Sequence, residues 1–291
     1  MFWKENLMNK EKIVTMQLLN QIHMEELLSL ATIVGWDYDK QEIRTLLASG
    51  TVFGHVNDKH TVVSCAAIIP YGSNLASIGM VIVHPDYRGI GLAKELLVTC
   101  MNQVSKDSAL MLIATREGRP VYEKLGFNDY SHVTKLLGEG KQCRQSLNGY
   151  TISPYQSKDF KEMLKLDKEA FGCERDLFLK NRFEQAKEVI VIKKSNLIVG
   201  YAAAVRKPAN LVIGPVVAQN DEQAMLLIQT IISNNRGMIR MDVVEGKKEI
   251  IKALVELDFQ EKDRPPVMVK NSEAFPERNG SLYAIAAQSY G

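Results

Sequence analysis

The chain has 291 residues, of which 46% are hydrophobic and 24% charged, and its formal net charge is +2. This length accommodates two domains of ordinary size, and this composition excludes a disordered chain. A charge so close to zero gives no sign of a general nucleic-acid or membrane surface, and no apolar run approaches the roughly 20 residues that cross a bilayer.

The first half of the chain alternates between strand and helix patterns. Hydrophobic periodicity and turn residues together define the elements. In chain order we expect a strand over 12–16, helices over 20–33 and 40–47, and strands over 51–56, 61–70 and 75–83.

The most informative segment runs from Gly79 to Ala93. A β-branched apolar run ends at Pro85, and a helical periodicity begins after Gly91. Between them, Gly89 and Gly91 stand where the backbone must turn sharply and present its N–H groups. Because such groups and the helix dipole both attract anions, this loop predicts a phosphate site. The alternative is an ordinary strand-to-helix turn that uses glycine for geometry alone.

The loop matches neither the nucleotide-binding pattern G-x-x-x-x-G-K-[ST] nor the three-glycine dinucleotide fingerprint. It matches Arg-x-x-Gly-x-Gly/Ala through Arg88, Gly91 and Ala93. In this form it resembles the pyrophosphate loop of the GNAT superfamily of acyl-CoA-dependent N-acyltransferases. The resemblance implies acetyl-CoA as the co-substrate. The residues that it assigns to cofactor binding are Val81, Ile82, Val83, Arg88, Gly89, Ile90, Gly91, Leu92, Ala93 and Lys94.

A second segment follows the apolar strand expected over 109–114. It has the order Tyr122-x-x-x-Gly126-Phe127, with Pro120 suited to a first helical turn and Gly126 to a C-terminal cap. This order resembles the GNAT segment that lines the binding site of the pantetheine arm and carries a tyrosine near the thioester sulfur. The resemblance implies that Tyr122 is the catalytic residue that protonates the departing CoA thiolate. The alternative is a tyrosine that only lines the wall.

The second half of the chain repeats the pattern of the first. Two local correspondences support the repeat, because 78–82 resembles 213–217 and 122–127 resembles 254–259. The expected elements are strands over 150–153, 188–193, 197–206, 211–218 and 238–243, and helices over 158–171, 221–232 and 247–255.

The second copy lacks the glycine loop and the tyrosine of the first. No glycine precedes its helix, Asp221 and Glu222 would repel a phosphate there, and Leu254 stands in the place of Tyr122. This combination resembles a tandem-GNAT subgroup of the holothin acyltransferase type, in which the second domain would wall the acceptor pocket.

The repeat predicts an α/β fold with a mixed, mostly antiparallel α+β sheet flanked by helices. We expect two tandem GNAT-like domains joined by a glycine-containing linker over 138–149. Residues 1–140 would form the acetyl-CoA-binding catalytic domain, and residues 141–291 a degenerate GNAT-like domain.

Residues for the acceptor are less specific than those for the cofactor. Trp36 follows the first helix and could stack on a substrate, Tyr71 lies at a turn between strands, and Ser77 could hold a relay water. Each has a structural alternative, as an aromatic anchor or a core residue. The strand over 75–83 has no carboxylate, so no general base is identified, and His84 lies at its exposed end.

These features predict an acetyl-CoA-dependent N-acetyltransferase that transfers an acetyl group directly to a small primary amine, with Tyr122 as general acid. The alternatives are a non-catalytic acyl-CoA or metabolite-binding module and a protein N-acetyltransferase. We expect a monomer or homodimer with a small-molecule amine as partner, and no nucleic acid, membrane or metal. Four scattered cysteines without metal-ligand spacing favour a reducing, cytoplasmic setting: Cys65, Cys100, Cys143 and Cys173.

Overall fold

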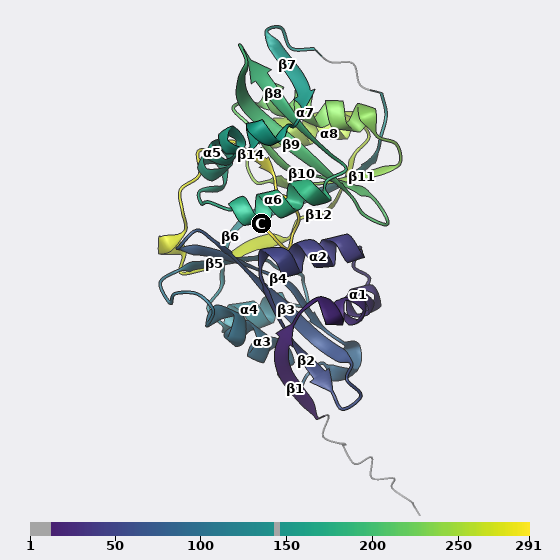
Figure 1. The fold of residues 1–291 in the computed structure, drawn as a ribbon, viewed down its shortest axis with the longest axis vertical. Helices are drawn as coiled ribbons and strands as arrows, with labels where there is room; N and C mark the ends of the chain where they lie inside the picture. Colours follow the sequence, from purple (N-terminus) through teal and green to yellow (C-terminus); the bar gives the residue numbers. More distant parts are fainter. Residues whose placement is uncertain (1–12, 143–145) are drawn as a thin grey trace, which may run out of the picture.

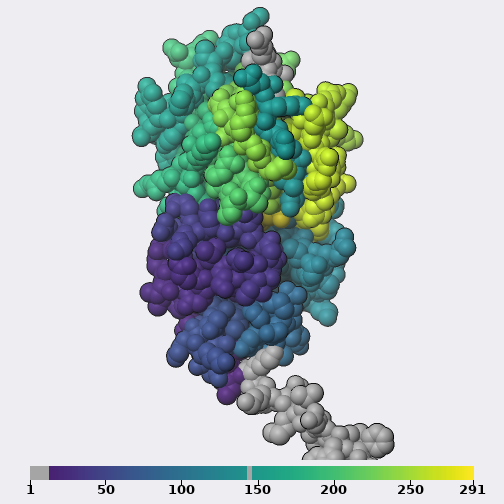
Figure 2. All heavy atoms as spheres, turned by 90° about the vertical axis from the view of Figure 1, so that its right-hand side faces the viewer, coloured from purple at the N-terminus to yellow at the C-terminus, as the bar shows by residue number. Residues whose placement is uncertain are grey.

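The computed structural model describes residues 13–142 and 146–291, so Cys143 lies outside the described residues. The molecule is elongated, with the first half of the chain at one end and most of the second half at the other (Figure 1). Figure 2 shows the two halves adjoining across the width of the molecule.

The elements of the first half follow the expected order, except for the last strand, over 128–139, which the sequence analysis did not predict. They are β1 (Val14–Leu19), α1 (Met24–Ile33), α2 (Lys40–Ser49), β2 (Thr51–Asn57), β3 (Val62–Tyr71), β4 (Leu75–Val83), α3 (Leu92–Met101), β5 (Ala109–Ile113), α4 (Arg119–Lys124) and β6 (Asn128–Glu139). Short 3₁₀ turns precede α1 at Gln21–His23 and α3 at Pro85–Tyr87.

The second half adds a similar series. Its elements are β7 (Tyr150–Pro154), α5 (Phe160–Phe171), α6 (Asp176–Gln185), β8 (Glu188–Lys194), β9 (Leu197–Arg206), β10 (Leu211–Ala218), α7 (Asp221–Asn234), β11 (Met238–Val244), α8 (Lys248–Glu256), β12 (Gln260–Asp263), β13 (Pro266–Lys270) and β14 (Leu282–Ala284). The repeat extends to details, because the chain after α4 and after α8 turns through positive φ at Gly126 and Asp258.

The described strands form one continuous sheet. Its order is β1-β2-β3-β4-β5-β13-β6-β11-β14-β10-β9-β8-β7, with β12 paired to β6. Two neighbouring pairs, β4–β5 and β10–β11, are parallel, and the other pairs are antiparallel. The expected mixed and mostly antiparallel sheet is therefore confirmed. Helices pack on it, α3 against β3 and β4, and α7 against β9 and β10.

The two halves exchange strands. The first part of β6 pairs with β13, and its second part, over 133–139, pairs with β11 of the other half. In return β13, from the second half of the chain, lies between β5 and β6. Each end of the molecule therefore contains a strand from the other half of the sequence. The division near residue 140 stays a proposal, and it does not divide the sheet into two independent parts.

Part of the expected linker is strand. Gly138 lies in β6, and a Cβ there would come within 2.5 Å of the Phe259 ring, so the glycine permits close packing of these two segments. The sequence analysis also missed α6 and the short strands β12, β13 and β14. These strands are three to five residues long and gain their hydrogen bonds from distant partners, which leaves little local pattern to detect.

Candidate active site

A cleft opens between β4 and β5. The two strands pair only near their starts, from Leu75 opposite Ala109 to Ser77 opposite Met111. Beyond Ser77, this edge of β4 has no strand partner among the described residues, so its backbone groups face the cleft.

A β-bulge lies at the wall of this cleft. Ala67 of β3 is opposite Gly79, whereas Cys65 is opposite Ile82, so β4 carries one extra residue between these pairs. Met80 in the bulge has φ +51°, a conformation that non-glycine residues adopt rarely and that often marks a functional site. The bulge removes part of the backbone near Met80 from the ladder and makes it available to a ligand.

The loop at the end of β4 forms an anion cradle. Gly89 and Gly91 have φ +82° and +94°, and Gly91 is the N-cap of α3. A Cβ at either glycine would meet no atom within 4 Å, so open space lies above them. The first N–H groups of α3 have no partner within the helix and suit phosphate oxygens. The loop therefore fits a pyrophosphate group.

A cavity of about 960 Å³ contains this loop and the cleft. Every residue that the sequence assigns to the cofactor lines it except Ile90, which is 54% exposed. The Arg88 Nε donates to the Val83 carbonyl at 3.2 Å, which ties the loop to the end of β4. The sequence analysis did not single out other lining residues, including Val34, Thr115, Glu117 and Lys124.

Tyr122 lies deep in the same cavity. It is 5% exposed, its ring packs edge-on against Phe127, and a Cβ at Gly118 would lie 2.9 Å from its hydroxyl oxygen. The hydroxyl makes no hydrogen bond with another described residue. Burial raises the pKa of Tyr122 to about 12, so the phenol stays protonated at neutral pH.

A second cavity, of about 250 Å³, adjoins the first. Four residues line both cavities, which therefore meet at this point: Trp36, Val81, Thr115 and Tyr122. Trp36 stacks on Tyr38 with ring centroids 5.9 Å apart, and the Tyr38 hydroxyl pairs with Ser289. Both halves of the chain contribute to the lining, the second through Lys207, Asn210, Arg240 and residues 287–289. The sequence analysis expected Trp36 at an acceptor site and Tyr122 at the reacting atoms, but it predicted none of the polar lining residues from the second half.

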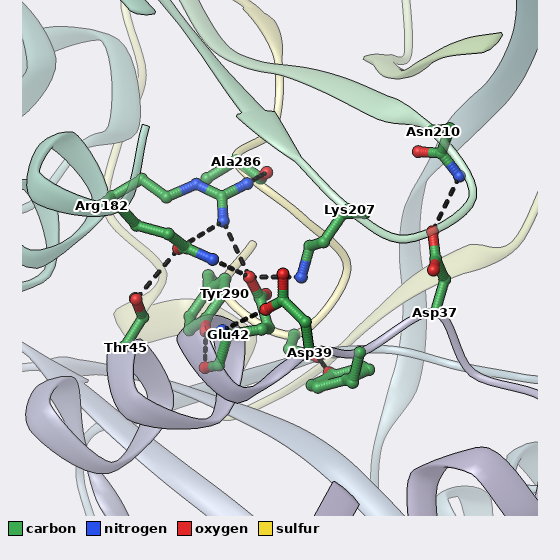
Figure 3. A network of polar contacts seen from close by, with 12 residues as sticks. Asp37, Asp39, Glu42, Thr45, Arg182, Lys207, Asn210, Ala286 and Tyr290 are labelled. Carbon is green, nitrogen blue, oxygen red and sulfur yellow. Dashed lines mark hydrogen bonds and ion pairs between the residues drawn. The ribbon is translucent and has the colours of Figure 1, made fainter. Parts of the chain in front are cut away.

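A buried ionic network holds the two halves together beside the second cavity. Glu42 of α2 lies between Arg182 of α6 and Lys207 (Figure 3). Gln185 of α6 also donates to the Glu42 carboxylate, at 2.6 Å. Burial alone would raise the pKa of Glu42, but the Lys207 and Arg182 charges lower it to about 2. Glu42 is therefore a fixed anion that joins α2 to the second half.

The structure places Tyr71 and Ser77 in the core, and neither lines the two cavities. The Tyr71 hydroxyl donates to the Tyr290 carbonyl at 2.7 Å and its ring packs on Phe171. The Ser77 hydroxyl lies 3.5 Å from the Ser289 carbonyl oxygen. Both side chains therefore contact the C-terminal segment (281–291), which lies between the halves.

The corresponding cleft in the second half is filled. β10 and β11 also pair only over a short parallel stretch, from Leu211 opposite Ile239 to Ile213 opposite Met241. Beyond it, β14 from the C-terminal segment pairs with both strands, through Ala284 opposite Val216 and Val243.

The start of α7 is also occupied. The Tyr283 hydroxyl donates to Asp221 at 2.8 Å, at the N-terminus of α7. The chain itself therefore takes the space that the first half leaves open, and a carboxylate stands where its counterpart has a glycine loop.

Four other features of the chain have structural roles: a buried ion pair, a histidine cap and two buried thiols. Asp167 and Arg175 form a buried bidentate ion pair within the second half. His84 caps the 3₁₀ turn before α3. The thiols of Cys65 and Cys100 are buried, and burial raises the pKa of Cys100 to about 12 and that of Cys65 further, so both stay protonated and are poor nucleophiles.

Comparison with known proteins agrees with this geometry. Two family models, both described as acetyltransferase (GNAT) domain, match residues 30–136 and 163–284. An uncharacterised N-acetyltransferase of Bacillus subtilis, YitH, is 31% identical over 275 residues, which cover 94% of this chain and 97% of that protein. The chain belongs to the GNAT acetyltransferases. It is thus a GNAT acyltransferase with two GNAT domains in tandem.

Solved structures show the same fold. A protein from Pyrococcus horikoshii, assigned as an acetyltransferase, matches with a TM-score of 0.78 at 17% identity, covering 100% of this chain and 99% of that one. A tandem GNAT protein from the clavulanic acid biosynthesis pathway matches with a TM-score of 0.66 at 13% identity, covering 89% and 98%.

Two further observations concern the described residues of this GNAT protein. None of its described helices combines the length and apolarity needed to cross a membrane. Within the same residues, no three His, Cys, Asp or Glu side chains come together in a group that could hold a metal ion.

Proposed function

We propose that this GNAT protein is an acetyl-CoA-dependent N-acetyltransferase that transfers an acetyl group directly to a small primary amine. One observation carries the proposal: the cavity with the glycine loop meets a second, smaller cavity at Tyr122 and Val81. A donor lying along β4 and an acceptor in the second cavity would bring their reacting atoms together at this junction.

The cofactor end of the site follows from the loop. The α3 N-terminus and the backbone around Gly89 and Gly91 would bind the pyrophosphate, with Arg88 and Lys94 adding positive charge. The thioester would then lie beside the bulge of β4, where a backbone N–H polarises its carbonyl.

Tyr122 serves as general acid in this proposal. The amine nitrogen forms a bond to the thioester carbon, the carbon–sulfur bond breaks, and the sulfur takes the Tyr122 proton. The nitrogen loses one proton to solvent water and the tyrosinate takes one proton from it, so the overall reaction neither releases nor consumes a proton. The raised pKa of Tyr122 keeps the proton in place until sulfur leaves, and the same burial raises the proton affinity of the thiolate.

The buried carboxylate of the second cavity is not suited to be the general base. Glu42 lines the second cavity, but its lowered pKa, about 2, makes it a very weak base. We propose that the acceptor reacts from its neutral amine form. The kcat/KM for the amine should then rise with pH up to the pKa of the acceptor amine.

The second half has a supporting role. Its own cleft is filled by β14, and residues 287–289 wall the second cavity. We assign catalysis to residues 1–140 and a degenerate, substrate-walling role to 141–291, as in the holothin acyltransferase type. A volume of about 250 Å³ favours a small amine over a protein N-terminus. The free thiols of Cys65, Cys100 and Cys173 agree with a cytoplasmic enzyme, and we propose a monomer or homodimer.

The first test is CoA thiol release from acetyl-CoA against a panel of small amines, amino acids and aminoglycosides. Stimulation by one chemical class supports the transferase and identifies its acceptor. Binding of acetyl-CoA without stimulation by any amine would favour a non-catalytic binding module. Acetylation of peptide N-termini alone would favour a protein N-acetyltransferase.

A further inference from the structure

The second cavity has an uneven distribution of charge. Five charged side chains line it: Asp37, Glu42, Lys135, Lys207 and Arg240. The three cations outnumber the two carboxylates, so the identity of the unpaired cation indicates what the cavity binds.

Both lining carboxylates are already occupied. Glu42 pairs with Lys207 and Arg182. Asp37 accepts from the backbone N–H of Ala209 at 3.0 Å and from the Asn210 amide at 3.1 Å. Lys207 therefore has its counter-ion, and both carboxylates already accept hydrogen bonds or ion pairs from other groups.

Lys135 lies on β6, the strand shared by the two halves. It is opposite Asp242 of β11 in the register, but both carboxylate oxygens of Asp242 already accept from Arg240, and one also accepts from Gln288 at 3.0 Å. No hydrogen bond or ion pair joins the Lys135 ammonium to another described residue. The half-buried Lys135 thus lies among carboxylates, including Asp263 opposite it on β12, but its ammonium forms no hydrogen bond or ion pair with a described residue.

Arg240 adds a second unused donor nearby. Its Nε and Nη2 bind Asp242, both at 3.0 Å, whereas its Nη1 makes no hydrogen bond with a described residue. Burial and the neighbouring Arg240 charge lower the pKa of Lys135 by more than the Asp242, Asp263 and Asp37 carboxylates raise it. A negative group between the two cations would remove this repulsion and favour the charged ammonium.

We propose that Lys135, assisted by Arg240, binds a carboxylate of the acceptor, which is therefore a small primary amine that carries a carboxylate, such as an amino acid. This inference rests on the proposed function and specifies its substrate class. The reaction is acetyl transfer from sulfur to the amine nitrogen, with loss of one amine proton and gain of one proton by the CoA thiolate. The acceptor carboxylate is not consumed.

A single unpaired ammonium matches a monoanion better than a dianionic phosphate. The cavity volume, about 250 Å³, also favours an acceptor of amino-acid size. The acceptor carboxylate would lie beside β6 and β11, which carry Lys135 and Arg240. The acceptor amine would lie beside Tyr122, which lines the same cavity.

The experiment compares matched acceptors in the CoA-release assay. Amino acids are tested against their amides, and O-phosphoethanolamine represents a phosphate-bearing amine. We expect a KM for the preferred amino acid at least about tenfold below that of its amide, the loss typical of one unmade charged contact. Converting the carboxylate to an amide lowers the pKa of the neighbouring amine, so more of the amide carries a neutral, reactive amine. This effect works against the expected preference for the amino acid.

Variants then test the residue. Lys135→Met should raise the KM for the amino acid about tenfold or more, with the KM for acetyl-CoA and for the amide unchanged. Lys135→Arg should retain the preference, and Lys135→Glu should shift it toward diamines. The matched control is Lys262→Met, an exposed lysine on the adjacent strand β12.

The outcomes are distinguishable. Turnover of amides and amino acids with equal KM, preference for the phosphate-bearing amine, or an equal rise in both KM values in Lys135→Met would overturn the carboxylate assignment alone. A panel without turnover of any amine would overturn the proposed transferase as well. Should Lys135→Met fail to fold, the comparison of acceptors on the wild-type protein still decides the question.

Discussion

Tyr122 depends on its neighbours for its chemical character. The short helix α4 presents it, Gly118 leaves room for its hydroxyl, and Phe127 packs against its ring. Burial keeps the phenol protonated, and its hydroxyl has no partner among the described residues at the junction of the two cavities. A phenol that only filled space would not need to be at this junction.

Replacement of Tyr122 by Phe tests its acid role. We expect kcat to fall about 10²- to 10⁴-fold, the usual contribution of a general acid, while the KM for acetyl-CoA changes little. Steady-state kinetics with an identified amine measures both values. Tyr130→Phe, at a 54% exposed tyrosine, is the matched control. Full turnover by Tyr122→Phe would show that the hydroxyl is not the acid.

Gly91 is constrained by its backbone. Its φ of +94° is costly for any residue with a side chain, and the open space above it is where a phosphate would sit. The same substitution at Gly246, which has φ +89° and is remote from both cavities, carries a comparable backbone cost.

Gly91→Val should therefore raise the KM for acetyl-CoA about tenfold or more, because the side chain enters the anion cradle. Gly246→Val should leave this KM unchanged while losing similar thermal stability. Equal KM values in the two variants would contradict the phosphate role of the loop.

At the scale of elements, α2 and α6 are joined by charge rather than by apolar contact alone. Glu42 on α2 is buried and bound by Arg182 and Gln185 of α6 and by Lys207. Removing one member of such a network leaves the other charges buried and uncompensated.

Glu42→Ala should lower the free energy of unfolding by about 3–5 kcal/mol, the range for a broken buried ion pair. Glu42→Gln keeps the shape and isolates the charge. Because the pKa of Glu42 is lowered from 4.5 to about 2, its contribution is complete above pH 4.5 and is lost as the pH falls toward 2.

Denaturant unfolding at several pH values measures this effect. The stability difference between wild type and Glu42→Gln should shrink steadily below pH 4.5. The control is Glu25→Gln, since Glu25 forms an exposed ion pair with Lys40 and should change stability little at any pH. A difference independent of pH would show that the Glu42 charge does not stabilise the contact.

At the scale of the whole molecule, the two halves exchange strands, and the C-terminal segment fills the cleft of the second half only. β6 and β13 cross between the halves, and the C-terminal segment contacts both β4 and β10. A Cβ at Gly79 would lie 2.4 Å from the Ser289 carbonyl oxygen, and one at Gly214 would lie 1.9 Å from the Ile285 carbonyl oxygen. One segment thus fills the cleft of the second half and lines the second cavity, which also contains residues of the first half.

The protein should therefore bind one acetyl-CoA per chain despite its two GNAT domains. Titration calorimetry measures the stoichiometry directly, and Gly91→Val should weaken the single binding event without revealing another. Two binding events per chain would contradict the conclusion that β14 occupies the second cleft.

The sequence by itself determined the family and the mixed sheet, and nine of the residues that it assigned to the cofactor line the first cavity. These depend on local signals: the glycine spacing at 89–91, the helical period that follows it, and the order of Tyr122, Gly126 and Phe127. Local signals also showed that the second copy lacks a phosphate loop. Because backbone turns and caps are specified within a few residues, such features are readable without the fold.

Only the tertiary structure identified the charged residues that line the second cavity. Lys135, Lys207 and Arg240 are far apart in the sequence and look like ordinary surface charges there, and strand pairing across the halves brings them to one cavity. The sequence suggested Tyr71 and Ser77 as residues of the acceptor site, but the C-terminal segment packs against both and places them in the core. Long-range pairing of short strands leaves no local pattern, so which charges remain without a partner is a property of the folded molecule alone.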